Sequence, residues 1–132
     1  MTPTDLIRKW IDLFNAADID GLANMYDEDA VNEQAVFTEP LTGRAAIKAL
    51  FETDFGRAKM VCIEERVYEC GDTAILQWRD PIGLKGCGFF QFKDGKIVHQ
   101  KGYFDQLTFF RAQGLPIPDE YLGTGLSDRG DA

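Results

Sequence analysis

FFQFKDGKI, residues 89–97, contains two apolar, strand-forming runs on either side of an Asp-Gly pair. Asp94-Gly95 in this setting favours a type I′ turn, whose twist matches that of the strands it joins. The second run continues to Phe104 with alternating polarity, which is the period of a strand with one buried face. The segment therefore predicts an antiparallel hairpin whose second strand covers residues 96–104.

The chain before this hairpin, from Ala58 onward, has the same two-residue period. Turn signals at residues 70–72 and 81–83 divide it into further short strands. Together with the hairpin they predict a meander of four antiparallel strands.

The first part of the chain has a helical period instead. Thr2 is placed to cap a first helix, with Asp5 completing a variant of the capping box. The apolar residues of that helix recur at three-to-four spacing and are Leu6, Ile7, Trp10, Ile11, Leu13, Phe14 and Ala17. Asp18 would cap a short second helix whose buried side holds Leu22, Met25 and Tyr26. A strand would follow at residues 30–37, and Thr42 would cap a third helix. After the meander, Asp105 is placed to cap a closing helix.

The order of these elements predicts the fold class. Helices followed by a run of strands favour an α+β domain in which helices lie on one face of an antiparallel sheet. A strongly curved sheet wrapped around the N-terminal helices makes a cone with an internal pocket. With 132 residues the chain has room for one domain, which we place at residues 1–115, followed by a C-terminal tail at residues 116–132.

Composition limits the classes of partner. The net charge of −8 and the scattered Lys and Arg residues argue against nucleic acid as a partner. The start, MTPTDLIRKW, has no apolar run typical of a signal peptide, and no segment is long and apolar enough to span a membrane. We therefore expect a cytoplasmic protein. The cysteines, at positions 62, 70 and 87, lack the spacing of metal ligands, so we expect buried free thiols and no metal site.

Several longer motifs together carry a family resemblance that spans residues 4–115. They are WIDLFNAAD (10–18), MYDEDA (25–30), LTGRAAI (41–47), FFQFKDGKI (89–97) and GYFDQLTFFRAQGL (102–115). The chain resembles the SnoaL-like branch of the nuclear transport factor 2-like superfamily, which also holds ketosteroid isomerases and limonene-epoxide hydrolases. The resemblance implies the cone-shaped fold, a pocket for an apolar molecule, a homodimer and chemistry without a cofactor. It does not specify the reaction, because one fold hosts many functions.

Ketosteroid isomerases provide the first comparison of catalytic residues. The resemblance places their catalytic base at Gln34, their oxyanion-hole tyrosine at Trp10 and their hydrogen-bonding acid at Gly88. An amide cannot abstract a proton at neutral pH, and glycine has no side chain to donate a hydrogen bond. The sequence therefore lacks that mechanism.

Limonene-epoxide hydrolases provide the second comparison, since they use two acids bridged by an arginine. One acid survives as Asp80, while the arginine falls at Trp78 and the other acid at Gly102. Their water-positioning tyrosine and asparagine fall at Asn32 and Gln34. The paired charges that hold and activate the water are therefore incomplete here.

Asp80 is the best candidate for a catalytic residue. Strand alternation places it on the same face as Leu76 and Trp78, the face that the resemblance turns toward the pocket. Desolvation by apolar rings raises the pKa of a carboxyl group and makes it a useful acid or base near neutrality. The alternative is that Asp80 caps the turn at Pro81, or pairs with Arg79 or Lys85.

Uncharged polar residues make up the rest of the expected site. Gln100 would reach the pocket from the last strand and, with Asn32 and Gln34, could orient a carbonyl or a hydroxyl group. Alternatively, these amides satisfy buried backbone groups. Apolar rings would line the pocket or form ordinary core, namely Trp10, Phe14, Trp78, Phe90 and Phe104. His99 lies on the opposite strand face, which also carries Ile75 and Tyr103 and which we expect a second copy to cover.

Two hypotheses about function follow. The first is a cofactor-independent isomerase, cyclase, dehydratase or hydrolase acting on an apolar, oxygen-bearing molecule, with Asp80 as acid or base. The second is a binding protein of the same fold without catalytic acids, which the amides at Gln34 and Gln100 favour.

Overall fold

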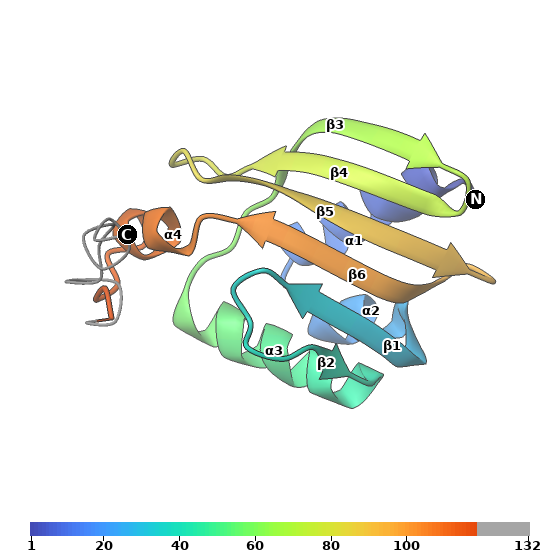
Figure 1. Cartoon of the computed structure of the whole chain (residues 1–132), viewed down its shortest axis with the longest axis horizontal. Coiled ribbons are helices and arrows are strands. Elements are labelled where there is room, and N and C mark those ends of the chain that lie inside the picture. The colour runs from blue at the N-terminus through green and yellow to red at the C-terminus, as the bar shows by residue number, and fades with distance from the viewer. Residues whose placement is uncertain (119–132) are drawn as a thin grey trace, which may run out of the picture.

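A computed structural model of the chain describes residues 1–118. Six strands form one sheet in the order β2-β1-β6-β5-β4-β3, and helices cover one side of it (Figure 1). In chain order the elements are α1 (Pro3–Asn15), α2 (Ile19–Asn24), β1 (Tyr26–Gln34), β2 (Leu41–Thr42), α3 (Arg44–Arg57), β3 (Ile63–Cys70), β4 (Thr73–Arg79), β5 (Lys85–Lys93), β6 (Lys96–Phe104) and α4 (Gln106–Ala112).

The predicted meander is confirmed. β3, β4, β5 and β6 pair with their sequence neighbours, and every one of these pairings is antiparallel. At the β5–β6 turn both Asp94 (φ 52°) and Gly95 (φ 77°) lie in the left-handed region, as a type I′ turn requires.

The first strand is longer than predicted and joins the sheet in a parallel pairing. β1 begins at Tyr26 rather than at residue 30, and it pairs in parallel with β6. Tyr26 is fully buried opposite Ile97, whereas the acidic run that follows lies partly outside, and the register shifts between Tyr26 and Val31. The helical spacing of Tyr26 with Leu22 concealed this strand start, because a single buried residue fits either period.

The helix caps test the local predictions. The capping box of Thr2 and Asp5 is present, and Asp18 and Asp105 each accept a hydrogen bond from a backbone N–H in the first turn of their helix. Thr42 as the cap of α3 was wrong. It lies in β2, paired with Val31, so the cap position falls on the next residue, a glycine with φ 98° and no capping side chain.

The helices lie against one face of the curved sheet. α1 packs on β3 and β4, while α3 packs on β1 and on α2, and Figure 1 shows α3 along the edge that β1 and β2 form. The buried core between these layers includes Ile7, Leu22, Ile47, Leu76, Phe90 and Ile97. The expected α+β fold, with a curved sheet around N-terminal helices, is confirmed.

Within residues 1–118 no helix is long and apolar enough to cross a membrane. Residues 119–132, which hold most of the predicted tail, lie outside the described residues. The cysteines are free, as expected, but only Cys62 is buried, and Cys70 is exposed because it ends β3 at a hairpin turn.

Two glycines in the sheet leave space for side chains of neighbouring strands. A Cβ atom at Gly86 would overlap the indole ring of Trp78 and would lie 2.7 Å from the backbone oxygen of Tyr103. A Cβ atom at Gly102 would overlap the side-chain amide of Gln34. These strands therefore need glycine at the two positions so that Trp78 and Gln34 can occupy their places.

We predict that Gly86→Ala lowers the free energy of unfolding by about 1–3 kcal/mol, because both the ring and the neighbouring backbone must shift. Gly56→Ala is the matched control, since a Cβ at Gly56 in α3 meets nothing within 4 Å and should stabilise the helix by about 0.5–1 kcal/mol. Urea unfolding measures both. A Gly86→Ala protein as stable as the wild type would show that Trp78 does not rest on β5.

Candidate functional site

A cavity of about 350 Å³ lies between the inner face of the sheet, α1, α3 and α4. Every residue predicted for the site lines it, and these are Trp10, Phe14, Asn32, Gln34, Trp78, Asp80, Phe90, Gln100 and Phe104. The sequence could predict that these side chains share one pocket, because strand alternation and helical spacing decide which face each residue occupies. Their roles stay predictions.

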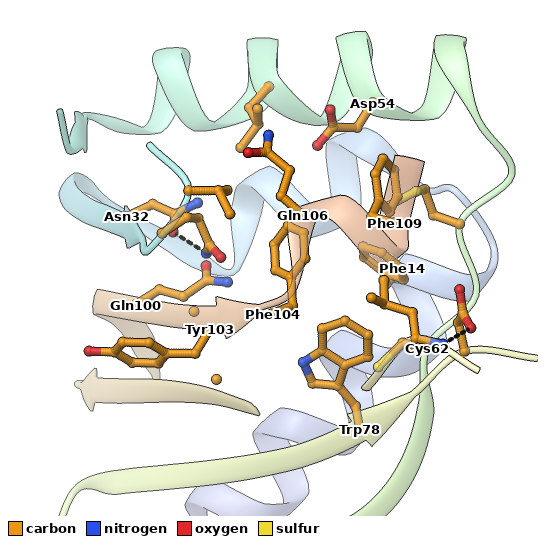
Figure 2. A pocket seen from close by; sticks show the side chains of 18 of the residues that line it. Phe14, Asn32, Asp54, Cys62, Trp78, Gln100, Tyr103, Phe104, Gln106 and Phe109 are labelled. Atoms are coloured by element: carbon orange, nitrogen blue, oxygen red, sulfur yellow. Dashed lines mark hydrogen bonds between the residues drawn. The ribbon is translucent and has the colours of Figure 1, made fainter. Parts of the chain in front are cut away.

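Aromatic rings form most of the wall. Trp10 stacks on Phe14 with ring centroids 4.9 Å apart and meets the edge of Phe90 at 5.2 Å. Trp78 on β4 and Phe104 on β6 lie near each other, with ring centroids 6.2 Å apart and the ring planes tilted by 56° (Figure 2). Trp10 and Phe90 also belong to the core, so for these two residues both interpretations hold.

A chain of buried hydrogen bonds underlies the polar end of the cavity. The indole Nε1 of Trp10 donates to the hydroxyl of Tyr26 (3.1 Å), and this hydroxyl donates to Oε1 of Gln100 (2.5 Å). Burial raises the pKa of Tyr26 well above the ordinary range of a tyrosine, partly opposed by the hydrogen bond from Trp10, so the phenol stays protonated. Sequence analysis missed Tyr26 because it was assigned to a helix face.

The other amides pair with each other. Nε2 of Gln34 donates to Oδ1 of Asn32 at 2.8 Å, and the parallel register places Asn32 directly beside Gln100. None of these three side chains bonds to the backbone of a residue in the described part of the chain. The alternative that they satisfy buried backbone groups was therefore wrong.

Asp80 is buried, with 7% of its surface exposed, and lies just after β4. Its Oδ1 accepts hydrogen bonds from the backbone N–H groups of Ile82 (3.0 Å) and Leu84 (2.8 Å), so it does cap the turn. Arg79 instead lies 3.8 Å from Glu65. Oδ2 of Asp80 makes no hydrogen bond within residues 1–118, and the residue lines the cavity. Capping of the turn therefore leaves Oδ2 available to a molecule bound in the cavity.

A second carboxyl group lines the same cavity and was missed. Asp54 projects from α3, with 26% of its side chain exposed, and Figure 2 shows its carboxylate turned into the pocket. Burial raises its pKa, and Arg57, whose guanidinium lies 3.1 Å away, opposes that rise. The signal was available, because Asp54 follows Leu50 and Phe51 by one helical turn and so shares their inward face.

Two further reactive side chains are unsuited to catalysis in this cavity. Burial raises the pKa of the Cys62 thiol to about 12, so it is not a thiolate nucleophile at neutral pH. His99 faces away from the cavity, as expected, with Nε2 3.5 Å from Oε2 of Glu33 and without a hydrogen bond. Among residues 1–118, no group of three or more His, Cys, Asp or Glu residues is placed to hold a metal ion.

Solved structures of the same shape come from several organisms. The chain matches a protein with a ketosteroid isomerase-like fold from Catenulispora acidiphila, in complex with trimethylamine, at 14% identity and a TM-score of 0.76 over 88% of this chain and 96% of that chain. It matches an LEH-like epoxide hydrolase of M. tuberculosis at 20% identity and a TM-score of 0.68 over 83% and 86% of the two chains. It also matches an NTF2-like protein of unknown function from Cytophaga hutchinsonii at 17% identity and a TM-score of 0.70 over 83% and 96%.

At these identities the likeness establishes the fold and not the activity. The family assignment does not depend on them, because the family model of the SnoaL-like domain matches residues 7–100, which include most of α1, all of α2 and α3, and most of the sheet. The chain therefore belongs to the SnoaL-like domain family.

Proposed function

We propose that this protein binds an apolar, oxygen-bearing small molecule in the cavity and converts it without a cofactor, with Asp80 as general acid or base. The observation that carries the proposal is that a buried carboxylate, three amides and a wall of aromatic rings line one cavity. Apolar walls with a few polar groups are typical of sites that bind and orient small molecules. Isomerisation, cyclisation, dehydration and hydrolysis all fit such a site.

Asp80 supports the catalytic part of the proposal through its geometry. Two backbone N–H groups hold Oδ1, so the carboxylate has a fixed orientation in the turn. The remaining oxygen can take a proton from the substrate or from a water molecule and return it later in the reaction. A fixed orientation matters because proton transfer requires the acceptor within hydrogen-bond reach of the proton.

A second candidate function is binding without catalysis. The amides at Gln34 and Gln100 favour it, because they orient a ligand but cannot transfer a proton at neutral pH. The turn-capping bonds also give Asp80 a structural reason to be present. The two candidates differ in whether the carboxylate of Asp80 is needed for turnover.

The test is turnover by Asp80→Asn, assayed by mass spectrometry on a panel of terpene epoxides and unsaturated cyclic ketones. We predict a drop of roughly 100- to 10,000-fold against the wild type, because asparagine can still cap the turn but cannot accept the proton. Asp72→Asn is the matched control, since it makes the same change at an exposed turn residue that does not line the cavity, and it should keep the wild-type activity.

Equal turnover by the wild type and Asp80→Asn would eliminate Asp80 as the catalyst. Tight binding of panel members without turnover by the wild type would make the binding protein the better account.

We further propose a homodimer formed through the outer face of the sheet, in the cytoplasm. Tyr68 and Tyr103 are more than 40% exposed, and Tyr103, which also borders the cavity (Figure 2), packs edge-on against Phe89 at 6.0 Å. Exposed aromatic rings on a sheet face support burial against a second copy, which related folds commonly provide.

Light scattering during gel filtration should give the mass of a dimer for the wild type, and Tyr103→Glu should shift it toward the monomer by placing a charge in the interface. Ile82→Glu serves as the control, since Ile82 is also a large exposed hydrophobic residue but lies in the β4–β5 turn. A monomeric wild type at high concentration would contradict the proposal.

A further inference from the structure

Two amide nitrogens at the polar end of the cavity have no hydrogen-bond partner among residues 1–118. Asn32 and Gln100 are 2% and 7% exposed, and both line the cavity from neighbouring strands at the same register position. Neither Nδ2 of Asn32 nor Nε2 of Gln100 donates a hydrogen bond to any residue from 1 to 118. Figure 2 shows the amide of Gln100 with its nitrogen turned toward Phe104 and the middle of the pocket.

The orientation of the Gln100 amide follows from the buried chain behind it. An indole N–H can only donate, so the hydroxyl of Tyr26 accepts from Trp10 and has its own proton to give. That proton needs an acceptor, and Oε1 of Gln100 is the one within reach. If the amide were reversed, an NH₂ group would face the hydroxyl and the buried phenol proton would lose its acceptor, at a cost typical of an unsatisfied polar group. Nε2 is therefore the end left for the cavity.

The orientation of the Asn32 amide is set from the other side. Gln34 lies over Gly102 and donates from Nε2 to Oδ1 of Asn32, which occupies the oxygen of that amide. The end left over is again the nitrogen. Tyr26 and Gln34 thus act as positioning residues that leave the nitrogen of each of two adjacent amides free of a partner among residues 1–118.

We propose that Nε2 of Gln100 and Nδ2 of Asn32 form a paired donor site for one carbonyl oxygen of the ligand. This proposal rests on the proposed function. It adds that the oxygen of the ligand is a hydrogen-bond acceptor and that it binds beside Asn32 and Gln100. A carbonyl oxygen has two lone pairs and takes one N–H from each amide. Because both residues are nearly enclosed while their nitrogens lie in the cavity, an acceptor bound here competes with less water than it would at an exposed site. An anion is disfavoured in comparison, because the chain carries a net charge of −8.

The experiment compares cyclooctanone with cyclooctane, two rings of the same size that differ in the carbonyl group. Isothermal titration calorimetry on the wild type should show the ketone binding at least about fivefold more tightly, as expected for one or two ordinary hydrogen bonds. In Tyr26→Phe, where nothing fixes the Gln100 amide, the ketone should lose that advantage while the affinity for cyclooctane is kept. Tyr68→Phe, which removes the hydroxyl of an exposed tyrosine, should keep the wild-type ratio.

Gln100→Met provides a second variant, which keeps Tyr26 but removes the donor nitrogen of residue 100 together with the acceptor of the phenol proton, and it should also bring the two affinities together. Retained binding of cyclooctane shows that a variant is folded and that its cavity is intact. Equal affinities in the wild type, or an unchanged ratio in Tyr26→Phe or Gln100→Met, would overturn the donor site while leaving the proposed function standing. Binding of neither ring by the wild type would contradict the proposed function and the donor site together.

Discussion

The hydrogen bonds from Trp10 to Tyr26 and from Tyr26 to Gln100 join α1, β1 and β6 at one buried point. Polar groups in such a place are costly unless each finds a partner, and in series they strengthen one another. Tyr26 is where β1 enters the sheet, so the same residue starts the parallel pairing with β6. That pairing sets Asn32 beside Gln100, and the polar end of the cavity depends on it.

Local patterns in the sequence were sufficient for much of this architecture. The Asp94-Gly95 turn, the capping box at Thr2 and the inward face of each strand depend on residues a few positions apart, and these were predicted correctly. The alternation that placed Gln100 and Trp78 in the cavity is of the same kind. Side chains from distant segments therefore met because each was aimed inward by its own strand or helix.

The missed features depend on contacts between distant segments, or on a period read too narrowly. Nothing near Tyr26 distinguishes the end of a helix from the start of a strand that pairs with β6 about seventy residues later. Thr42 looked like a cap because β2, formed only by pairing with β1, was not foreseen. Asp54 was not named as a candidate, although its spacing from Leu50 places it on the inner face of α3. The pKa of Asp54 is raised in the folded protein, so ionisation of its carboxyl group opposes folding. The stability that the protonated carboxyl group contributes is therefore lost as the pH rises above the ordinary range of an aspartate.

The cavity is thus lined by oriented amides and by two carboxyl groups that have different partners, the N–H groups of a turn for Asp80 and a guanidinium for Asp54. A bound molecule would span from the amides toward the acids with its apolar body among the rings. The most direct measurement is a crystal structure with cyclooctanone bound. We predict the ring in contact with Trp78 and Phe104 in the cavity, with its oxygen within hydrogen-bond distance of Nε2 of Gln100. A ketone bound only outside the cavity, or one whose oxygen lies away from the amides, would contradict this account.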